Sequence, residues 1–574
     1  MIAAPMPAPL AGSMNSAAHV YAECYPGSYQ AHMAQHGVTF EYSPAVREFP
    51  QPRLHFPPED ANATDIHDEL VFEAIASGAL TPLTPKLAAK ARAAGLRTIL
   101  HAHFVVPKPK PEPPPFHNSM AEARRQAGAA GVAQLLKWHR LVANFKPGLN
   151  NVIAPRDYRV RSAKTVRKHV RKGTHQFVLD AKSFYNQILM REYVSATMAL
   201  APHSSPRLRR WLHDHGASSL CYRTMAFGAA PAGYYPSAMM GAVLHLLRAY
   251  GVTVIDIMDD TNTLSDGNDL CHRADAAATV KALRAHGIAL NAGKAQRGFA
   301  PLFGGRVTDT IPDRLGRIHQ RIPEAWLLRK AESHWRPAMR QWLSGQPVTF
   351  ETVESINGQL QSTDDCIFGG RTFHAPFSAL VQNRLRGCSP AQARQERRHG
   401  IVTAAEADAA IRCLAFYCSD ALRAYNAHYI HATTTADWTI GCDASKHACG
   451  WRWLEGEIDQ PTSMGPLVTY MWPRAFHSLS KRSAFAEVRG LAHAALHETK
   501  RRNLRNGSLL VVTDSVCSAA ALRRGGARSQ TMNSILKRCN LWPTLRARNI
   551  EINAIFRPGT WMIERKIDEA SRPS

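Results

Sequence analysis

The stretch Val252-Thr-Val-Ile-Asp-Ile-Met-Asp-Asp-Thr-Asn-Thr-Leu264 decides how this chain is interpreted, because it places Asp259 and Asp260 together between two strand-like runs. Apolar and β-branched residues on either side of a short polar tip predict a hairpin with both carboxylates at its turn. Asp is a common turn former, so such a pair is by itself more often structural than catalytic. The segments that precede the hairpin change these odds.

Another acid, Asp180, ends the short apolar run Phe177-Val-Leu179, where a sheet would hold it and aim it outward. Between this acid and the hairpin lies Phe227-Gly-Ala-Ala-Pro-Ala-Gly233, a glycine-rich turn that opens a helix. Phosphoryl transfer by two divalent ions needs a cluster of carboxylates, whose oxygens are the hard ligands that magnesium prefers. The order of the segments therefore predicts a metal site made by Asp180, Asp259 and Asp260.

A second set of acids follows toward the C-terminus. Asp443 ends the strand candidate Trp438-Thr-Ile-Gly-Cys442, and Glu487 lies in a stretch with helical spacing of apolar residues. Asp514 ends a buried-strand run, and Asp568 lies close to the last residue. Taken singly, Glu487 is an ordinary surface helix residue and Asp514 an ordinary cap. Taken in order, the four acids resemble the pattern of RNase H, in which four carboxylates bind two metal ions and activate water against an RNA phosphodiester.

The first set of motifs resembles the palm of reverse transcriptases, and is most similar to that of the DIRS-like and related retrotransposons. The resemblance rests on Asp-x-Lys-Ser-x-Tyr-x-Gln-Ile from Asp180 to Ile188, on Phe-Gly before a helix and on x-Met-Asp-Asp in the hairpin. With the RNase H pattern it covers roughly residues 65 to 572. It implies an α+β fold, namely a right-hand polymerase with fingers, palm and thumb, followed by an α/β RNase H-like domain.

The resemblance also implies which acids bind metal. In the polymerase these would be Asp180, Asp259 and Asp260, and in the RNase H-like domain Asp443, Glu487, Asp514 and Asp568. Each site would take two Mg²⁺ ions, with Mn²⁺ as the alternative.

Residues that bind the incoming nucleotide are implied in the same way. Tyr185 matches the bulky side chain that stacks under the sugar and excludes a 2′-hydroxyl, while Phe227 and Gly228 match the Phe-Gly motif. Arg140 and Lys108 match groups of the fingers that hold the triphosphate, and Lys294 matches a lysine near the leaving pyrophosphate. For these three basic residues a solvated charge is the alternative interpretation.

Three residues differ from the family pattern, and these differences favour an alternative function. Ile257 stands where Tyr or Phe usually precedes x-Asp-Asp, Gly233 replaces the usual proline of the helix-opening turn, and Phe556 replaces a His before Pro558-Gly559. They favour a decayed or domesticated element protein that binds nucleic acid without efficient catalysis, whereas the intact carboxylates weigh against it. A polymerase of the intron or telomere type is a further alternative, against which the RNase H pattern counts.

The domain organisation follows from composition and periodicity. Residues 1–64 are rich in Ala, Pro and His without a sustained period, which predicts a disordered leader. Residues 65–311 alternate strand-like and helical runs and would form the fingers and palm. Residues 312–436 are mostly helical and basic and would form the thumb or connection, and residues 437–574 would form the RNase H-like domain.

Charge points to polyanionic partners. The net charge is +25 with a pI near 9.9, and a basic protein of this kind gains affinity for nucleic acid by releasing condensed counterions. The expected partners are an RNA template, a DNA primer, an RNA–DNA hybrid and deoxynucleoside triphosphates. No protease or integrase signature is present, so an integration enzyme would be a separate chain.

Cysteine usage and hydropathy bear on location. The 11 cysteines form no CxxC pair and cannot all pair within one chain, which favours reduced thiols. The sequence contains no run of about 18 uninterrupted apolar residues, so it predicts no membrane span. We therefore expect an intracellular protein of the cytoplasm or nucleus that is not secreted.

Overall fold

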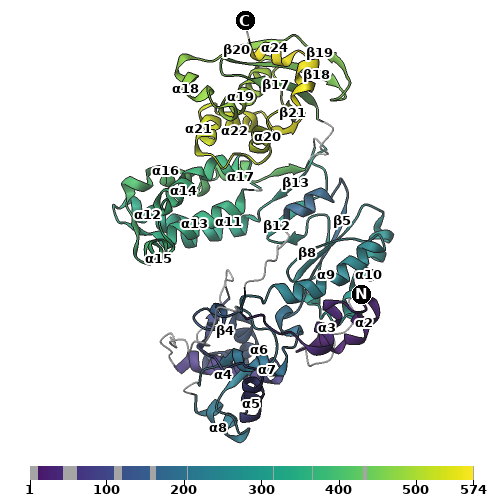
Figure 1. Ribbon diagram of the computed structural model, residues 1–574, viewed down its shortest axis with the longest axis vertical. Coiled ribbons are helices and arrows are strands. Elements are labelled where there is room, and N and C mark those ends of the chain that lie inside the picture. Colours follow the sequence, from purple (N-terminus) through teal and green to yellow (C-terminus); the bar gives the residue numbers. More distant parts are fainter. Residues whose placement is uncertain are drawn as a thin grey trace. The chain divides into compact units, whose positions relative to one another are not determined.

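The computed structural model describes residues 11–42, 61–108, 119–154, 163–202, 205–314, 316–364, 366–430 and 436–572. The chain divides into two compact units, the first made of residues 1–170 and 174–304 and the second of residues 171–173 and 305–574 (Figure 1). Helices and strands are mixed in both units, so the predicted α+β class is confirmed. In the described part of the chain, none of the helices combines the length and apolar character that a bilayer crossing requires.

The first unit contains an antiparallel sheet in the order β10 (Gln296–Gly298), β5 (His175–Asp180), β9 (Asp260–Ser265) and β8 (Thr253–Ile257). Helices α9 (Tyr234–Ala249) and α10 (Asp269–Ala285) pack against β8 and β9. The apolar residues of α9 that recur at helical spacing are buried in the same core as β5, because one face of the helix must cover the sheet. This core fixes the strand ends at which the predicted acids lie.

Six further strands of the first unit form a separate sheet and a hairpin. The sheet has the order β1 (Leu80–Pro82), β7 (Leu220–Tyr222), β6 (Ala199–Leu200) and β2 (Leu100–His101). The hairpin pairs β3 (His103–Pro107) with β4 (His139–Ala143), and helix α6 (Met120–Trp138) lies between these strands in the sequence. Helix α6 ends directly before the first residue of β4.

The prediction of a disordered leader is wrong for residues 11–42. This segment forms the short helices α1 (Ser13–Ser16), α2 (Ala18–Cys24) and α3 (Tyr29–His36). Met14, Tyr21 and Met33 are buried in the main core of the first unit, and the Tyr21 ring packs edge-on against His286 at 5.0 Å. Long-range packing, which composition does not report, orders the segment. Residues 1–10 and 43–60 lie outside the described residues.

The second unit begins with strands and then becomes helical. Strand β13 (Ile318–Arg321) pairs with β12 (Arg306–Asp309) and with β16 (His428–Ile430). Between β13 and β16 the chain is mainly helical: α11 (Glu324–Lys330), α12 (Arg336–Leu343), α13 (Phe350–Thr363), α14 (Gly370–Leu385), α15 (Pro390–His399), α16 (Ala404–Tyr417) and α17 (Ala421–Tyr425). Their shared core is built on large aromatic side chains such as Trp335, Trp342 and Phe377.

A mixed sheet organises residues 437–572. Its order is β19 (Pro461–Met464), β18 (Ala448–Gly456), β17 (Trp438–Ala444), β21 (Gly507–Thr513) and β22 (Ile550–Phe556), and β20 (Val468–Met471) also pairs with β18. Strand β17 runs antiparallel to β18 and parallel to β21, which is parallel to β22. Parallel neighbours bring the ends of β17 and β21 to the same edge of the sheet.

Helices cover this sheet. Helix α19 (Ser483–Arg501) packs on β17 and β18, and α20 (Val516–Arg523), α21 (Gln530–Arg538) and α22 (Leu541–Ala547) lie around it. The C-terminal helices α23 (Gly559–Glu564) and α24 (Ile567–Ser571) also contact the sheet. Gly450 permits this close approach, because a Cβ there would lie 2.4 Å from the Cβ of Ala570 and 2.8 Å from its backbone carbon.

A further close approach joins this sheet domain to helix α14. The Thr372 backbone N–H donates to the Gly525 carbonyl at 3.0 Å, and the buried indole N–H of Trp542 donates to the Thr372 hydroxyl at 3.0 Å. Gly369 lies under Trp542, where a Cβ would come within 2.6 Å of the ring. The loop that follows α20 is therefore fixed against the first turn of α14.

Replacing Gly450 with Ala should displace α24. The new methyl group meets backbone that cannot rotate away, so we expect a loss of about 1–3 kcal/mol in the free energy of unfolding, measured by chemical denaturation. The matched control is Gly358→Ala in α13, where a Cβ meets nothing within 4 Å. Ala is the better helix former, so this control should gain about 0.5–1 kcal/mol. The same sign for both variants would contradict the packing described here.

Candidate active sites

The first candidate site lies at the tip of the β8–β9 hairpin. Ile257 pairs with Asp260, so Met258 and Asp259 form the turn. Asp180 at the end of β5 is directly opposite Asp260 on β9, and the Ala181 N–H donates to the Asp259 carbonyl at 2.8 Å. Directly opposed residues of antiparallel strands have Cβ atoms about 4.5–5.5 Å apart on one face of the sheet. The structure thus brings the predicted acids Asp180, Asp259 and Asp260 to one place.

The turn itself is constrained. Met258 has φ 56°, a left-handed backbone conformation that is uncommon for a residue other than glycine. Such conformations cluster at functional sites, where the surrounding structure holds them in place. The β8–β9 pairing on one side and the contact with Ala181 on the other hold the turn here.

The carboxylates of this group repel one another. Burial, with the neighbouring charges of Asp259 and Asp180, raises the pKa of Asp260 to about 6. Burial also raises the pKa of Asp259. One counter-charge is present, because the Lys294 ammonium contacts Asp180 at 2.8 Å, and this hydrogen bond raises the pKa of Lys294. Lys294 lowers the pKa of Asp259 and Asp260, but burial and the neighbouring carboxylates outweigh it.

Tyr185, Phe227 and Arg140 form a chain of ring contacts. The rings of Tyr185 and Phe227 meet edge to face at 5.5 Å, and the Arg140 guanidinium lies 5.7 Å from the centre of the Phe227 ring. The Phe227 side chain is 54% exposed, so this chain of contacts presents an aromatic and cationic surface to solvent. These predicted nucleotide contacts therefore lie together.

The turn after Phe227 is held by a residue that the sequence did not single out. Asn150 donates to the Gly228 carbonyl at 2.9 Å and accepts from the Ala230 N–H at 2.7 Å. Gly228 has φ 97°, which glycine adopts without strain. No motif marks Asn150, because its partners lie about 80 residues further along the chain.

Lys108 is placed differently from the other predicted nucleotide contacts. It follows β3, and its ammonium group donates to the Lys137 carbonyl at 2.8 Å. This contact is made with the end of α6. The side chain is thus engaged next to the β3–β4 hairpin.

The second candidate site is a compact group of acids. Asp443 on β17, Glu487 on α19 and Asp514 after β21 offer ligand oxygens that all lie within 4.8 Å of one another. Among the described residues, this is the one group of three or more His, Cys, Asp or Glu side chains with that geometry. Asp568 on α24 is not part of this group, and its carboxylate pairs with Arg572 at 2.8 Å. Its charge nevertheless reaches the site, because it raises the pKa of both Asp443 and Asp514.

Burial and mutual repulsion perturb this group more than the first. Glu487 is 7% exposed, and burial raises its pKa to about 9, with further contributions from Asp443 and Asp514. Burial raises the pKa of Asp443 to about 6, although the Ser571 hydroxyl donates to it at 2.6 Å. Ser571 is a further site residue that sequence reasoning missed, although it lies one turn of helix after Asp568.

The donor set fits a divalent cation. Within the described part of the chain, the buried Oε2 atom of Glu487 has no hydrogen-bond partner. An unsatisfied buried carboxylate oxygen costs free energy, and a bound cation would remove that cost. Carboxylates alone suit hard ions such as Mg²⁺ or Mn²⁺ rather than metals that prefer nitrogen or sulfur ligands.

The raised pKa values predict how Mg²⁺ affects stability. Without a divalent ion, folded Asp443 and Glu487 keep protons up to pH values of about 6 and about 9, whereas the unfolded chain releases them near 3.8 and 4.5. The folded state then binds more protons, so the free energy of unfolding falls as pH rises through that window. Mg²⁺ should oppose this fall, and the melting temperature gained on adding Mg²⁺ should increase from pH about 6 to pH about 9.

Thermal melts with Mg²⁺ or with a chelator measure this effect. Glu487→Gln, which keeps the shape and removes the charge, should lose most of the gain at high pH. An equal Mg²⁺ effect in wild type and in this variant would show that the ion binds elsewhere.

Comparisons with known proteins bear mainly on the first site. A family model described as reverse transcriptase (RNA-dependent DNA polymerase) matches residues 131–335, a range that contains the acids and ring contacts of the first site. Lys108 lies before this range and the second acidic group lies after it. No curated protein matches the chain.

A comparison with solved structures matches foamy virus protease–reverse transcriptases. One in complex with double-stranded DNA is 10% identical, with 97% of this chain and 83% of that chain covered and a TM-score of 0.47. Another, in complex with an RNA/DNA hybrid, is 11% identical, with 96% and 64% covered and a TM-score of 0.46.

Proposed function

We propose that this chain is an RNA-directed DNA polymerase of a retrotransposable element, similar to the DIRS-like group, with an RNase H activity in its C-terminal domain. The observation that carries the proposal is the reverse transcriptase match over residues 131–335, together with the placement of Asp180 opposite Asp260 beside the Asp259 turn within that range. Residues 65–311 would be the fingers and palm, 312–436 the thumb or connection, and 437–574 the RNase H-like domain.

In the polymerase site, Asp180, Asp259 and Asp260 would hold two Mg²⁺ ions. Such ions polarise phosphoryl oxygens and stabilise the attacking and leaving oxygens of an in-line displacement. Lys294 now neutralises Asp180, so a cation bound there would release its ammonium group toward a phosphate of the nucleotide or of pyrophosphate. The lysine would thus contact a phosphate of the nucleotide before the reaction and of pyrophosphate after it.

The ring contacts would orient the incoming nucleotide. Tyr185 would lie under the sugar, and its ring is braced by Phe227. Arg140 lies on the other side of Phe227, where its guanidinium could hold the triphosphate. A bulky ring under the sugar leaves no room for a 2′-hydroxyl, so the same contact that positions the nucleotide would select deoxynucleotides.

In the RNase H-like site, Asp443, Glu487 and Asp514 would hold the metal ions, and Asp568 would complete the set from α24. The ions would activate a water molecule and stabilise the charge on the cleaved phosphodiester. The Ser571 hydroxyl donates to one oxygen of Asp443 and so fixes the orientation of this carboxylate. The partners would be an RNA template, a DNA primer, the RNA–DNA hybrid and deoxynucleoside triphosphates.

If the chain is a polymerase, neutralising either acid at the tip of the β8–β9 hairpin should abolish primer extension. Asp259→Asn or Asp260→Asn should lower Mg²⁺-dependent extension on an RNA template by at least about a thousandfold, roughly 4 kcal/mol of transition-state stabilisation. Asp256→Asn is the matched control, because Asp256 lies on the same hairpin but pairs with Arg248 at 3.1 Å. It should retain most of the activity. Equal loss in all three variants would argue against the assigned ligands.

The two sites should act independently. Asp443→Asn or Asp514→Asn should abolish cleavage of a labelled RNA–DNA hybrid while primer extension stays near the wild-type rate, because the acids belong to separate folded units. Simultaneous loss of both activities would contradict the assignment of two sites.

Tyr185→Ala should relax the discrimination against ribonucleotides by roughly tenfold or more, about 1.4 kcal/mol. Tyr185→Phe keeps the ring against Phe227 and should discriminate as the wild type does. Single-nucleotide incorporation with matched deoxy- and ribonucleotides measures both variants. Unchanged discrimination in Tyr185→Ala would remove this residue from the sugar contact.

A nucleic-acid-binding protein without efficient catalysis is the second candidate. Phe556 favours it, since this side chain ends β22 and is 43% exposed at a position where the RNase H family carries a His. Tight binding of an RNA–DNA hybrid, with extension and cleavage equally poor in wild type and in the acid-to-amide variants, would establish this alternative.

A further inference from the structure

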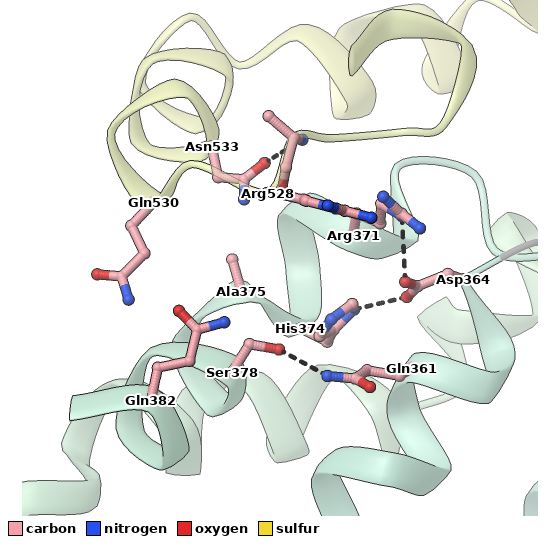
Figure 2. Close-up of a pocket in the computed structure, with 11 residues that line it drawn as sticks. Gln361, Asp364, Arg371, His374, Ala375, Ser378, Gln382, Arg528, Gln530 and Asn533 are labelled. Carbon is pink, nitrogen blue, oxygen red and sulfur yellow. Dashed lines mark hydrogen bonds and ion pairs between the residues drawn. The ribbon is translucent and has the colours of Figure 1, made fainter. Parts of the chain in front are cut away.

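A polar pocket of about 410 Å³ lies between α13, α14 and the start of α21, apart from both acidic groups (Figure 2). One face of α14 lines it through Arg371, His374, Ser378 and Gln382, and the loop before α21 adds Arg528. The volume falls within the range of about 300–1,000 Å³ that is typical of small-molecule sites. The pocket belongs wholly to the second unit.

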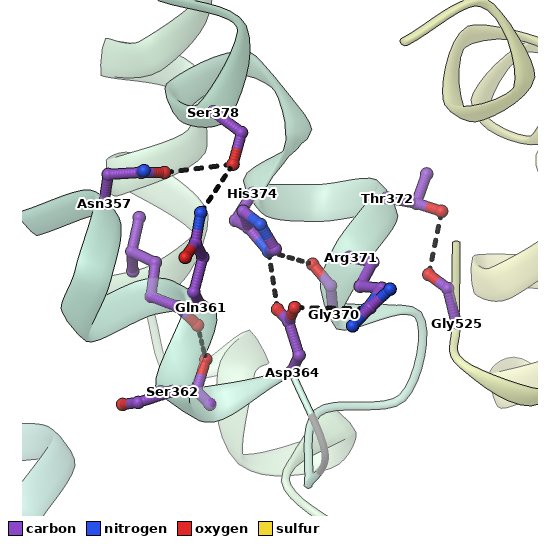
Figure 3. Close-up of polar contacts among 12 residues, drawn as sticks. Asn357, Gln361, Ser362, Asp364, Gly370, Arg371, Thr372, His374, Ser378 and Gly525 are labelled. Carbon is purple, nitrogen blue, oxygen red and sulfur yellow. Dashed lines mark hydrogen bonds and ion pairs between the residues drawn. The ribbon is translucent and has the colours of Figure 1, made fainter. Parts of the chain in front are cut away.

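The positive charge in this pocket exceeds the negative charge. Asp364 is the acid among the lining residues, and it already pairs with His374 at 2.5 Å and with Arg371 at 3.4 Å (Figure 3). Within the described residues, the exposed guanidinium of Arg528 makes no hydrogen bond or ion pair. Figure 2 shows Arg371 and Arg528 reaching the same side of the pocket. Because Asp364 is paired with Arg371 and His374, it does not neutralise Arg528, and the pocket keeps positive charge for an anion.

The walls of the pocket are fixed in place. Asn533 donates to the Ala527 carbonyl at 2.9 Å and accepts from its N–H at 2.8 Å, which pins the loop that carries Arg528. On the opposite wall, Gln361 donates to the Ser378 hydroxyl at 3.3 Å (Figure 3). The same loop is joined to α14 where Thr372 binds the Gly525 carbonyl. Little ordering would therefore be needed when a ligand enters.

Neutral donors complete the site. The amides of Gln382 and Gln530 are exposed and, among the described residues, engaged by no other side chain or backbone group. Figure 2 shows both on the side of the pocket away from Arg371 and Asp364. The first turn of α21 places Gln530 in the lining. Guanidinium groups and side-chain amide N–H groups together match the oxygens of a phosphate.

We propose that this pocket binds a phosphate group of a nucleotide unit, with Arg528 and Arg371 as its cationic contacts and Gln382 and Gln530 as donors at its mouth. The phosphate could belong to a nucleic-acid strand or to a free nucleotide, and both present the same chemistry. The site goes beyond the proposed polymerase and RNase H functions, because it uses none of their acids.

The test uses the full chain in EDTA, so that neither acidic group binds a divalent ion. One arm measures the affinity for a fluorescent single-stranded oligodeoxynucleotide over a range of salt concentrations, and the other measures the binding of thymidine monophosphate by equilibrium dialysis. The variants are Arg528→Gln and Gln382→Glu, both at exposed positions, and the latter places a carboxylate at the mouth. Arg524→Gln is the matched control, because Arg524 is exposed in the same loop and does not line the pocket.

Arg528→Gln should weaken binding at least about threefold in one arm and, for the oligonucleotide, lower the slope of log affinity against log salt by about 0.7, the value for one phosphate contact to a single strand. Gln382→Glu should weaken binding in the same arm, and Arg524→Gln should match the wild type. Dependence in the oligonucleotide arm identifies a strand phosphate, and dependence in the dialysis arm identifies a free nucleotide. Equal behaviour of Arg528→Gln and Arg524→Gln in both arms, or wild-type binding by Gln382→Glu, overturns the proposal.

Discussion

The structure must hold mutually repelling carboxylates close together at the ends of strands, and its other features depend on this constraint. In each acidic group, one acid ends a strand and another lies on or just after the neighbouring strand, so the hydrogen-bonded ladder sets their spacing. Burial, reinforced by the charges of the neighbouring acids, raises the pKa of Asp260 to about 6 and that of Glu487 to about 9. A sheet buried on both sides can impose such an arrangement, whereas a loop would relax away from it.

The two acidic groups differ in the interactions that offset this burial and repulsion. In the first, Lys294 supplies a positive charge to Asp180, and the left-handed backbone at Met258 fixes the turn. In the second, Arg572 pairs with Asp568 and lowers the pKa of Asp514, whereas Glu487 keeps a buried oxygen that is unsatisfied among the described residues. The second group is therefore the more compact and the more strongly perturbed, and a divalent cation would relieve it most.

Much of the first site could be predicted from the sequence, because its logic is local. An apolar run that ends in an acid places that acid at a sheet edge, and the hairpin around Asp259 follows from the flanking β-branched residues. Phe350, Val353, Ile356 and Leu360 have helical spacing in the same way, and all four are fully buried on one face of α13. Helical spacing around Glu487 indicated α19 in the same way.

What could not be predicted depends on partners that are distant in sequence. The helices of residues 11–42 are ordered by packing against the core of the first unit, which their composition does not reveal. Asn150, Ser571 and the carbonyl that engages Lys108 become visible only once the chain is folded. Asp568 follows the expected order of acids but lies outside the compact group, since its carboxylate pairs with Arg572.

Crystals of the chain with an RNA–DNA hybrid and Mn²⁺ would test the central claim most directly, through the anomalous diffraction of the metal. Anomalous peaks are expected between Asp180, Asp259 and Asp260 and between Asp443, Glu487 and Asp514. The Lys294 ammonium should no longer contact Asp180. Full Mn²⁺ occupancy elsewhere on the chain, with neither acidic group occupied and Lys294 still bound to Asp180, would contradict the central claim.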